Sequence, residues 1–114
     1  MRTDAQRLDD VLSAAAAIRS HLTRGTLSDG LVFDAARLRL IEIGEAVNDI
    51  EPKLLATEPT IPWRDVARMR DHLAHRYFDT DHAIIQATID HDLPPLVAAT
   101  ERLTQHLASE QDRT

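Results

Sequence analysis

The sequence contains no cysteine, few aromatic residues and only three glycines. The absence of cysteine excludes a disulfide framework and thiolate metal sites, and it fits a reducing compartment. Aromatic residues make up 4% of the chain, although 43% of it is hydrophobic. The core must therefore be built from aliphatic side chains, which suits closely packed helices.

Long apolar runs and an excess of positive charge are missing as well. No stretch approaches the roughly 18 consecutive apolar residues of a membrane span, and no basic start precedes an apolar segment. We therefore expect no membrane span, no signal peptide and a cytoplasmic location. The formal net charge is −6, whereas nonspecific nucleic-acid coat proteins are basic because they neutralise phosphates. A protein of this charge that handles RNA needs a local basic cleft.

Apolar residues recur every three or four positions, which is the period of an amphipathic helix. A length of 114 residues corresponds to one domain. We therefore predict a single all-α domain over residues 1–114, an up-down bundle of four to five helices. The expected helices are residues 4–24, 28–50, 62–78 and 81–108, with a helical turn at 53–56 and a break at 79–81.

The last predicted helix contains two adjacent prolines, Pro94 and Pro95. Neither can donate a backbone hydrogen bond, and a proline disfavours the helical conformation of the residue before it, here Leu93. We therefore expect a kink or a break at this point of the helix.

The second predicted helix is apolar on two faces. A helix of this kind lies at the centre of a bundle or is shared with a second subunit. Gly44 in its middle costs about 1 kcal/mol relative to alanine, which indicates a close contact with another helix. Glu42 and Glu45 lie beside the apolar faces, either as a solvated rim or as the lining of a cleft. The two stripes are Leu31, Ala35, Leu38 and Ile41, and Phe33, Ala36, Leu40, Ile43, Val47 and Ile50.

The third predicted helix carries the densest cluster of reactive side chains, residues 70–77 with the sequence RDHLAHRY. An α-helix turns by about 100° per residue, so Arg70 and His75 point about 140° apart. In one straight helix these two side chains do not converge on a ligand. Either the helix ends or distorts near His75, or a second chain completes the site, and we favour a dimer.

The residue types in this cluster suit cleavage of an RNA phosphodiester. An imidazole such as that of His75 can take or give a proton near neutral pH. The guanidinium fork of Arg70 can hold a phosphate and stabilise its charged transition state. Attack by the ribose 2′-hydroxyl needs neither a metal nor a protein nucleophile. Asp71, one turn before His75, is a candidate to orient the imidazole, and Arg76 adds to the basic charge of this helix.

A metal site is the competing chemical interpretation of this region. Imidazole and carboxylate ligands suit zinc, iron or manganese. Helical bundles that bind such metals draw ligands from several helices and often use a Glu-x-x-His pattern, which is absent here. We therefore predict no metal and no other cofactor. The residues of this alternative are His72, His75, Asp79, Asp81 and His82.

At this level of detail the sequence resembles the HepT-like toxins of the HEPN ribonuclease superfamily. Arg70, His75 and Tyr77 match the Arg-x4-His-x-Tyr motif of that superfamily, and Asp71 matches the polar residue usual after the arginine. The resemblance covers nearly the whole chain. It also rests on residues 38–46 (LRLIEIGEA), 59–64 (PTIPWR), 68–71 (RMRD) and 75–78 (HRYF).

The resemblance implies a HEPN-like helical domain with metal-independent endoribonuclease activity on tRNA or mRNA. It implies a homodimer whose cleft joins two motifs, with Arg70 and His75 as the catalytic pair and Asp71 as a supporting residue. The family commonly has a small residue or aspartate between the histidine and the tyrosine. Arg76 occupies that position here, where it adds a phosphate contact or changes the substrate preference.

The resemblance also implies a partner. HepT-like toxins pair with a minimal nucleotidyltransferase antitoxin, which transfers AMP from ATP to the motif tyrosine and thereby blocks the cleft. Tyr77 would be the modified residue in this chain. The alternative to the ribonuclease is a catalytically silent helical adaptor that only binds such a nucleotidyltransferase.

Overall fold

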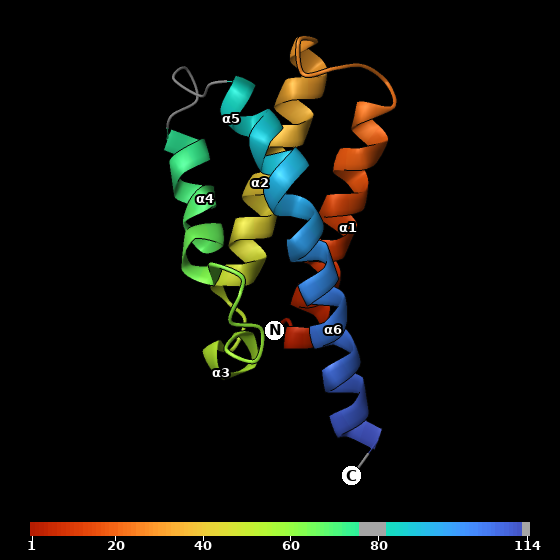
Figure 1. Ribbon diagram of the computed structural model, residues 1–114, viewed down its shortest axis with the longest axis vertical. Coiled ribbons are helices and arrows are strands. Elements are labelled where there is room, and N and C mark those ends of the chain that lie inside the picture. Colours follow the sequence, from red (N-terminus) through yellow and green to blue (C-terminus); the bar gives the residue numbers. More distant parts are fainter. Residues whose placement is uncertain (76–81, 113–114) are drawn as a thin grey trace.

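The computed structural model describes residues 1–75 and 82–112. This part of the chain contains helices and no strand, which confirms the predicted all-α class. None of its helices is both long enough and apolar enough to cross a membrane. The elements are α1 (Asp4–Leu22), α2 (Gly30–Asn48), α3 (Pro52–Leu55), α4 (Trp63–His75), α5 (His82–Ala87), the π-helical segment η2 (Thr88–Asp92) and α6 (Leu93–Asp112) (Figure 1).

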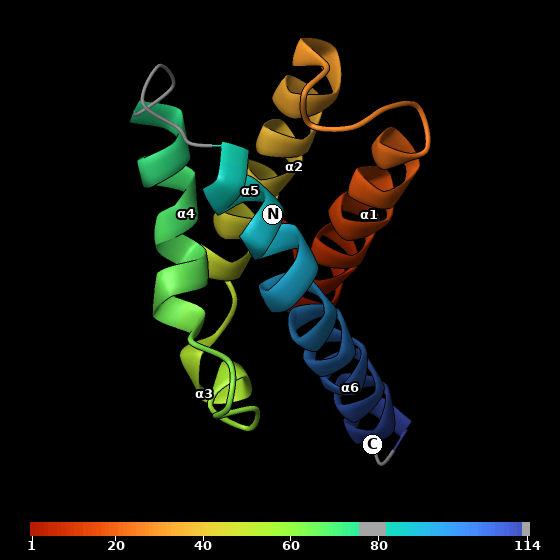
Figure 2. The same ribbon diagram turned by 45° about the horizontal axis from the view of Figure 1, so that its top comes forward.

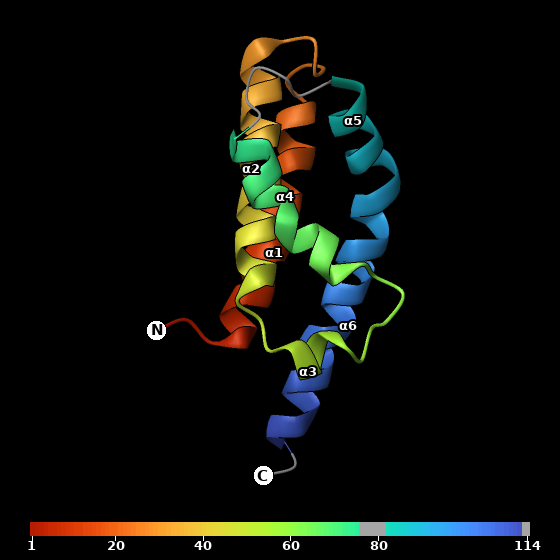
Figure 3. The same ribbon diagram turned by 90° about the vertical axis from the view of Figure 1, so that its left-hand side faces the viewer.

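The helix α2 lies at the centre of the bundle. It packs against α1 on one side and against α4 on the other, while α6 packs against α1. Figures 1 and 3 show α1 and α2 running in opposite directions, with α4 beside α2. Because α5, η2 and α6 follow one another without a gap, the described chain consists of four long helical segments and the short α3. This arrangement confirms the predicted up-down bundle of four to five helices.

Side-chain caps determine where the first two helices begin. Thr3 accepts a hydrogen bond from the backbone of Gln6, whose side chain accepts one from the backbone of Thr3. This capping box satisfies two N–H groups at the start of α1. Asp29 caps α2 in a similar way. The first two helices end about two residues before the predicted positions, at Leu22 and Asn48. None of the described glycines has the positive φ of a glycine cap, so Gly25 does not end α1 in that way.

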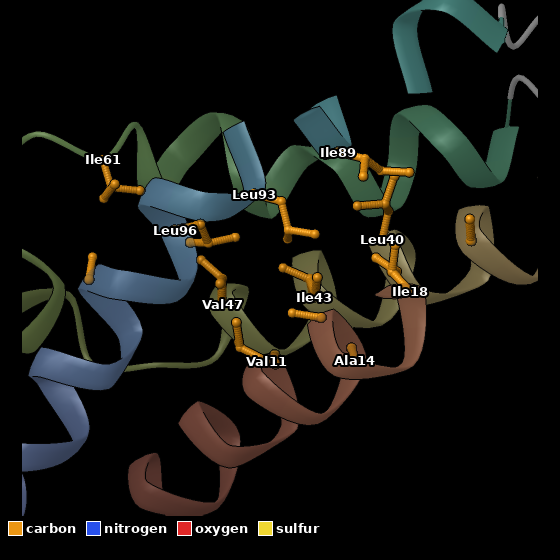
Figure 4. Close-up of a cluster of buried hydrophobic side chains, with 14 of the residues drawn as sticks. Val11, Ala14, Ile18, Leu40, Ile43, Val47, Ile61, Ile89, Leu93 and Leu96 are labelled. Atoms are coloured by element: carbon orange, nitrogen blue, oxygen red, sulfur yellow. The ribbon is translucent and has the colours of Figure 1, made fainter. Parts of the chain in front are cut away.

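The core is aliphatic, as the composition predicted. Figure 4 shows side chains of α1, α2 and the α5–α6 segment pointing toward one another. One of the two apolar stripes of α2 lies in this core, whereas the other lies at the surface, where Leu31 is 83% and Leu38 51% exposed. The second stripe is therefore exposed only in part, because Ala35 is half-buried and Ile41 packs half-buried against the core. The labelled core residues include Val11, Ala14, Ile18, Leu40, Ile43, Val47, Ile89, Leu93 and Leu96.

Of the predicted kink or break at the paired prolines, the break is absent, whereas the regular α-helical hydrogen bonding gives way to the π-helical segment η2 just before them. Leu93 has φ −66° and ψ −45°, which is the helical conformation that Pro94 was expected to disfavour. The wider turns of η2 precede the prolines, and Leu93 donates its N–H to Thr88 five residues back. Pro94 and Pro95 then fall in the first turn of α6, directly after the π-helical segment. Figure 2 shows the uninterrupted path of α5 into α6.

The connection between α3 and α4 is fastened to the rest of the bundle by Glu58. Arg102 of α6 donates to both carboxylate oxygens of Glu58, the shortest contact being 2.7 Å. These hydrogen bonds hold the pKa of the Glu58 carboxyl below its usual value. The backbone oxygen of Glu58 accepts a hydrogen bond of 2.9 Å from the indole of Trp63. Trp63 packs half-buried against the core.

Candidate active site

The candidate motif begins on α4 and continues past the described end of that helix. Arg70, Asp71 and His75 lie on α4. Arg76 and Tyr77, together with the predicted break at 79–81, lie outside the described residues. The geometry of the site is therefore built from the first three side chains and the groups that contact them.

The inward face of α4 is apolar and determines which side chains face outward. Leu73 is buried, and Trp63, Val66 and Met69 pack against the core at intervals of three and four. The polar residues of the motif are thereby placed on the flanks and the outer face of the helix.

The guanidinium of Arg70 is held by two carboxylates. Its Nη1 donates to Oε2 of Glu45 on α2 at 3.0 Å, and its Nε lies 3.6 Å from Oδ1 of Asp71. The side chain of Arg70 is 30% exposed and that of Glu45 61% exposed. The guanidinium of Arg70 is therefore oriented by groups of the chain itself.

The imidazole of His75 is oriented by the backbone of its own helix. Its Nδ1 lies 2.8 Å from the carbonyl oxygen of Asp71. Because a carbonyl oxygen only accepts hydrogen bonds, Nδ1 must carry the proton, which leaves Nε2 to exchange protons with a substrate. We expected the carboxylate of Asp71 to orient His75. The structure assigns this contact to its main-chain oxygen, while the carboxylate lies near Arg70.

Arg70 and His75 face different directions, as the helix geometry predicted. Arg70 is turned toward α2, where it contacts Glu45, whereas His75 is exposed and bonded back to α4. In the described part of one chain, the contacts of Arg70 and those of His75 therefore involve different groups.

A second contact from α2 reaches the same end of α4. Nη1 of Arg37 donates to the carbonyl oxygen of Leu73 at 2.6 Å. Leu73 lies two residues before His75 on the same helix. Arg37 therefore fastens the turn that carries His75.

Two hollows lie near the motif helix, and neither contains His75. One, of about 700 Å³, runs between α1 and α2 and includes Arg39, Glu42 and Glu45. Glu45 thus lines a cleft, which is the sharper of the two roles considered for it. The other, of about 410 Å³, lies between α4 and the η2–α6 segment and is lined mainly by apolar residues such as Met69 and Leu93.

The described residues give little support to the alternative metal site. Among them, no group of three or more histidine, aspartate or glutamate side chains is arranged to hold a metal ion. The ring of His82 stacks on that of Phe33, with centroids 4.1 Å apart. Two other members of that candidate set, Asp79 and Asp81, lie outside the described residues.

The contacts that α2 makes with the motif were not predicted from the sequence. Arg37 was not singled out, and Glu45 was named without its partner. The only local signal was Gly44, which predicted a close helix contact next to Glu45. A Cβ at Gly44 would lie 2.9 Å from the backbone nitrogen of Arg70, so the contact is with α4 itself.

Comparison with known proteins identifies relatives across most of this fold. The family model described as "Ribonuclease HepT-like" matches residues 9–103, from α1 into α6. A probable ribonuclease HepT from Thermococcus cleftensis is 35% identical over 107 residues, which cover 90% of this chain and 96% of the relative. A putative RNase from Caldanaerobacter subterraneus subsp. tengcongensis is 35% identical over 75 residues, covering 65% of this chain and 67% of the relative. No solved structure is significantly similar.

The matched region includes α2, α4 and the whole motif from Arg70 to Tyr77. It also agrees with the helical architecture and with the resemblance found in the sequence. The chain belongs to the HepT-like ribonuclease family.

Proposed function

We propose that this protein is a metal-independent endoribonuclease that acts on tRNA or mRNA in the cytoplasm as the toxin of a toxin–antitoxin pair. The observation that carries the proposal is the oriented state of the two motif side chains. Arg70 is held by Glu45, and His75 is bonded through Nδ1 so that Nε2 is available for proton transfer. Two relatives that are named as ribonucleases support the same chemistry.

The proposed reaction uses the ribose 2′-hydroxyl as the nucleophile. A base takes the 2′-hydroxyl proton while the oxygen attacks the adjacent phosphorus, and the bond to the 5′-oxygen of the next nucleotide breaks. The leaving oxygen receives a proton, which gives a 2′,3′-cyclic phosphate and a 5′-hydroxyl end. His75 supplies the proton transfer, and Arg70 stabilises the added charge on the phosphate oxygens. Arg76 adds a phosphate contact or alters the substrate preference.

A homodimer completes this site in our proposal. One chain turns Arg70 and His75 away from each other, so a second copy is needed to bring an arginine and a histidine to one phosphate. The exposed apolar face of α2, with Leu31 and Leu38, is a surface through which two copies can pack.

The test of this function is RNA cleavage by the purified full-length protein in the presence of EDTA. We expect cleavage of cellular tRNA or mRNA with 2′,3′-cyclic phosphate ends and no loss of rate when divalent metals are removed. An absence of cleavage, together with tight binding of the neighbouring nucleotidyltransferase and no effect on growth, would instead establish the silent adaptor.

Modification of Tyr77 is the proposed means of neutralisation. Tyr77 is seven residues after Arg70, and an AMP group in the cleft would add negative charge beside the phosphate-binding arginine. Incubation with the cognate nucleotidyltransferase and ATP should raise the mass of the protein in steps of one AMP and abolish cleavage. Intact-mass spectrometry measures this, and Tyr77→Phe should remain unmodified and active. An unchanged mass of the wild-type protein would refute the modification.

A further inference from the structure

We propose that α2 positions both halves of the motif, with Glu45 orienting Arg70 and Arg37 fixing the turn that carries His75. This inference rests on the proposed ribonuclease function for its kinetic consequences. Neither residue belongs to the Arg-x4-His motif, and both lie on a different helix from it.

The first support is the close approach of α2 to α4. A Cβ built at Gly44 would lie 2.9 Å from the nitrogen of Arg70, 3.0 Å from the oxygen of Val66 and 3.2 Å from that of Ala67. Backbone is thus packed against backbone at the position of Arg70. Glu45 follows Gly44 directly, so its carboxylate reaches the guanidinium of Arg70 from a part of α2 that is packed tightly against α4.

The geometry at Arg70 leaves room for a ligand. The guanidinium has five N–H donors in a planar fork. Glu45 engages Nη1 at 3.0 Å and Asp71 lies 3.6 Å from Nε, so these two described carboxylates leave the donors of Nη2 to a phosphate. Glu45 thereby fixes the plane of the fork without filling it. Because the Glu45 side chain is 61% exposed, its ion pair contributes little to folding, and its role in activity can be separated from stability.

The contact of Arg37 acts at the other end of the motif. Its bond of 2.6 Å to the carbonyl oxygen of Leu73 joins α2 to the last described turn of α4. The imidazole of His75 is bonded within the same turn, to the carbonyl oxygen of Asp71. Displacement of this turn would move the imidazole relative to a bound phosphate, and small misplacements of a reacting group are costly to the rate.

The two contacts predict different kinetic effects. Loss of Glu45 disturbs a group that binds the phosphate in the ground state and in the transition state, so KM should rise and kcat/KM should fall. Loss of the Arg37 contact disturbs proton transfer, so kcat should fall with little change in KM. A purely structural role would not separate the two constants in this way.

The experiment compares Glu45→Ala, Glu45→Gln, Arg37→Gln and Arg37→Lys in full-length protein, with a short RNA substrate. Glu45→Ala should lower kcat/KM by about tenfold to a hundredfold. Glu45→Gln keeps an acceptor oxygen and Arg37→Lys keeps a charged donor, so each should recover part of the loss. All four variants should keep the thermal midpoint within a few degrees of the wild type. If Glu45→Ala or Arg37→Gln melts at a lower temperature, the kinetic constants of Glu45→Gln or Arg37→Lys are compared with the wild type instead.

The matched control is Glu42→Gln. Glu42 forms an ion pair with Arg39 at 2.9 Å on the same helix, with side chains of 43% and 35% exposure, and its partner among the described residues is Arg39 rather than Arg70 or His75. Its substitution should leave kcat and KM unchanged. Unchanged kinetics in Glu45→Ala, or a rise in its activity, would overturn the proposal, and the rise would identify Glu45 as a competitor of the phosphate.

A second measurement does not depend on catalysis. The Nη1–H signals of Arg70, the nitrogen that Glu45 contacts, should be slow to exchange in NMR spectra of the wild type and of Glu42→Gln, and fast in Glu45→Ala. Restrained exchange in a wild-type protein that cleaves no RNA would refute the proposed function and keep the positioning role. Fast exchange in a protein that does cleave RNA would refute the positioning role alone.

Discussion

His75→Ala should lower the rate of RNA cleavage by about 10²- to 10⁴-fold, which is the usual contribution of a general acid or base. Arg70→Ala should lower it by about 10²- to 10³-fold, because one charged donor to the developing negative charge is lost. Both side chains are partly or fully exposed, so neither substitution removes a core contact. Initial rates on a defined RNA, with melting curves of each variant, measure the effect.

The matched control for this prediction is His72→Ala. His72 is an exposed histidine on the same helix, three residues before His75 and at one of the four variable positions of the Arg-x4-His pattern. Its loss should change the rate by less than about threefold, as expected of a surface substitution. Equal losses in both histidine variants would contradict a specific role for His75.

Mixing the two inactive variants tests whether the site is shared between chains. If one protomer supplies Arg70 and its partner His75, a mixed dimer of Arg70→Ala and His75→Ala contains one intact site. Partial recovery of cleavage after subunit exchange is therefore expected. No recovery, in a dimer shown to exchange, would mean that each site uses the arginine and histidine of a single chain.

Gly44→Ala should destabilise the protein by about 1–3 kcal/mol, the usual cost of overpacking. In an exposed helix the same change would stabilise by about 1 kcal/mol, because alanine is the better helix former. The added Cβ would meet backbone atoms of α4 at 2.9 to 3.2 Å, and backbone cannot move aside as a flexible side chain can. Equilibrium denaturation in urea measures the change, and RNA cleavage should fall as α4 is displaced.

Gly30→Ala provides the control on the same helix. A Cβ at Gly30 meets no atom within 4 Å, so the substitution should be neutral or slightly stabilising. A Gly44→Ala variant as stable as Gly30→Ala would show that α2 and α4 can separate at no cost. The close packing of α2 against α4 would then no longer support the positioning role of Glu45.

The parts of the structure that could be predicted are those that depend on local pattern. Apolar spacing identified α1, α2 and α4, because helical periodicity depends on neighbours three and four residues apart. The opposed directions of Arg70 and His75 followed from the helical turn alone. The contact at Gly44 was predicted because a glycine in a helix interior needs a reason.

The parts that could not be predicted depend on contacts between distant residues. Glu45 and Arg70 are 25 positions apart, and Arg37 and Leu73 are 36 apart. No local pattern indicates such pairs. The contact between His75 and the carbonyl oxygen of Asp71 could not be predicted, because every residue has a carbonyl and only the carboxylate distinguishes an aspartate in the sequence. The break expected at Pro94 and Pro95 is absent because five residues of π-helix precede the two prolines, which an ideal α-helix would not accommodate.

The lone tryptophan has a practical consequence for all of these experiments. Trp63 stands at the first residue of α4, half-buried, with its indole N–H bonded to the backbone of Glu58. Since the chain has no other tryptophan and only one tyrosine, excitation at long ultraviolet wavelengths reports on this position alone. Its intrinsic fluorescence emission therefore reports, without any label, whether the motif helix α4 is packed against the bundle.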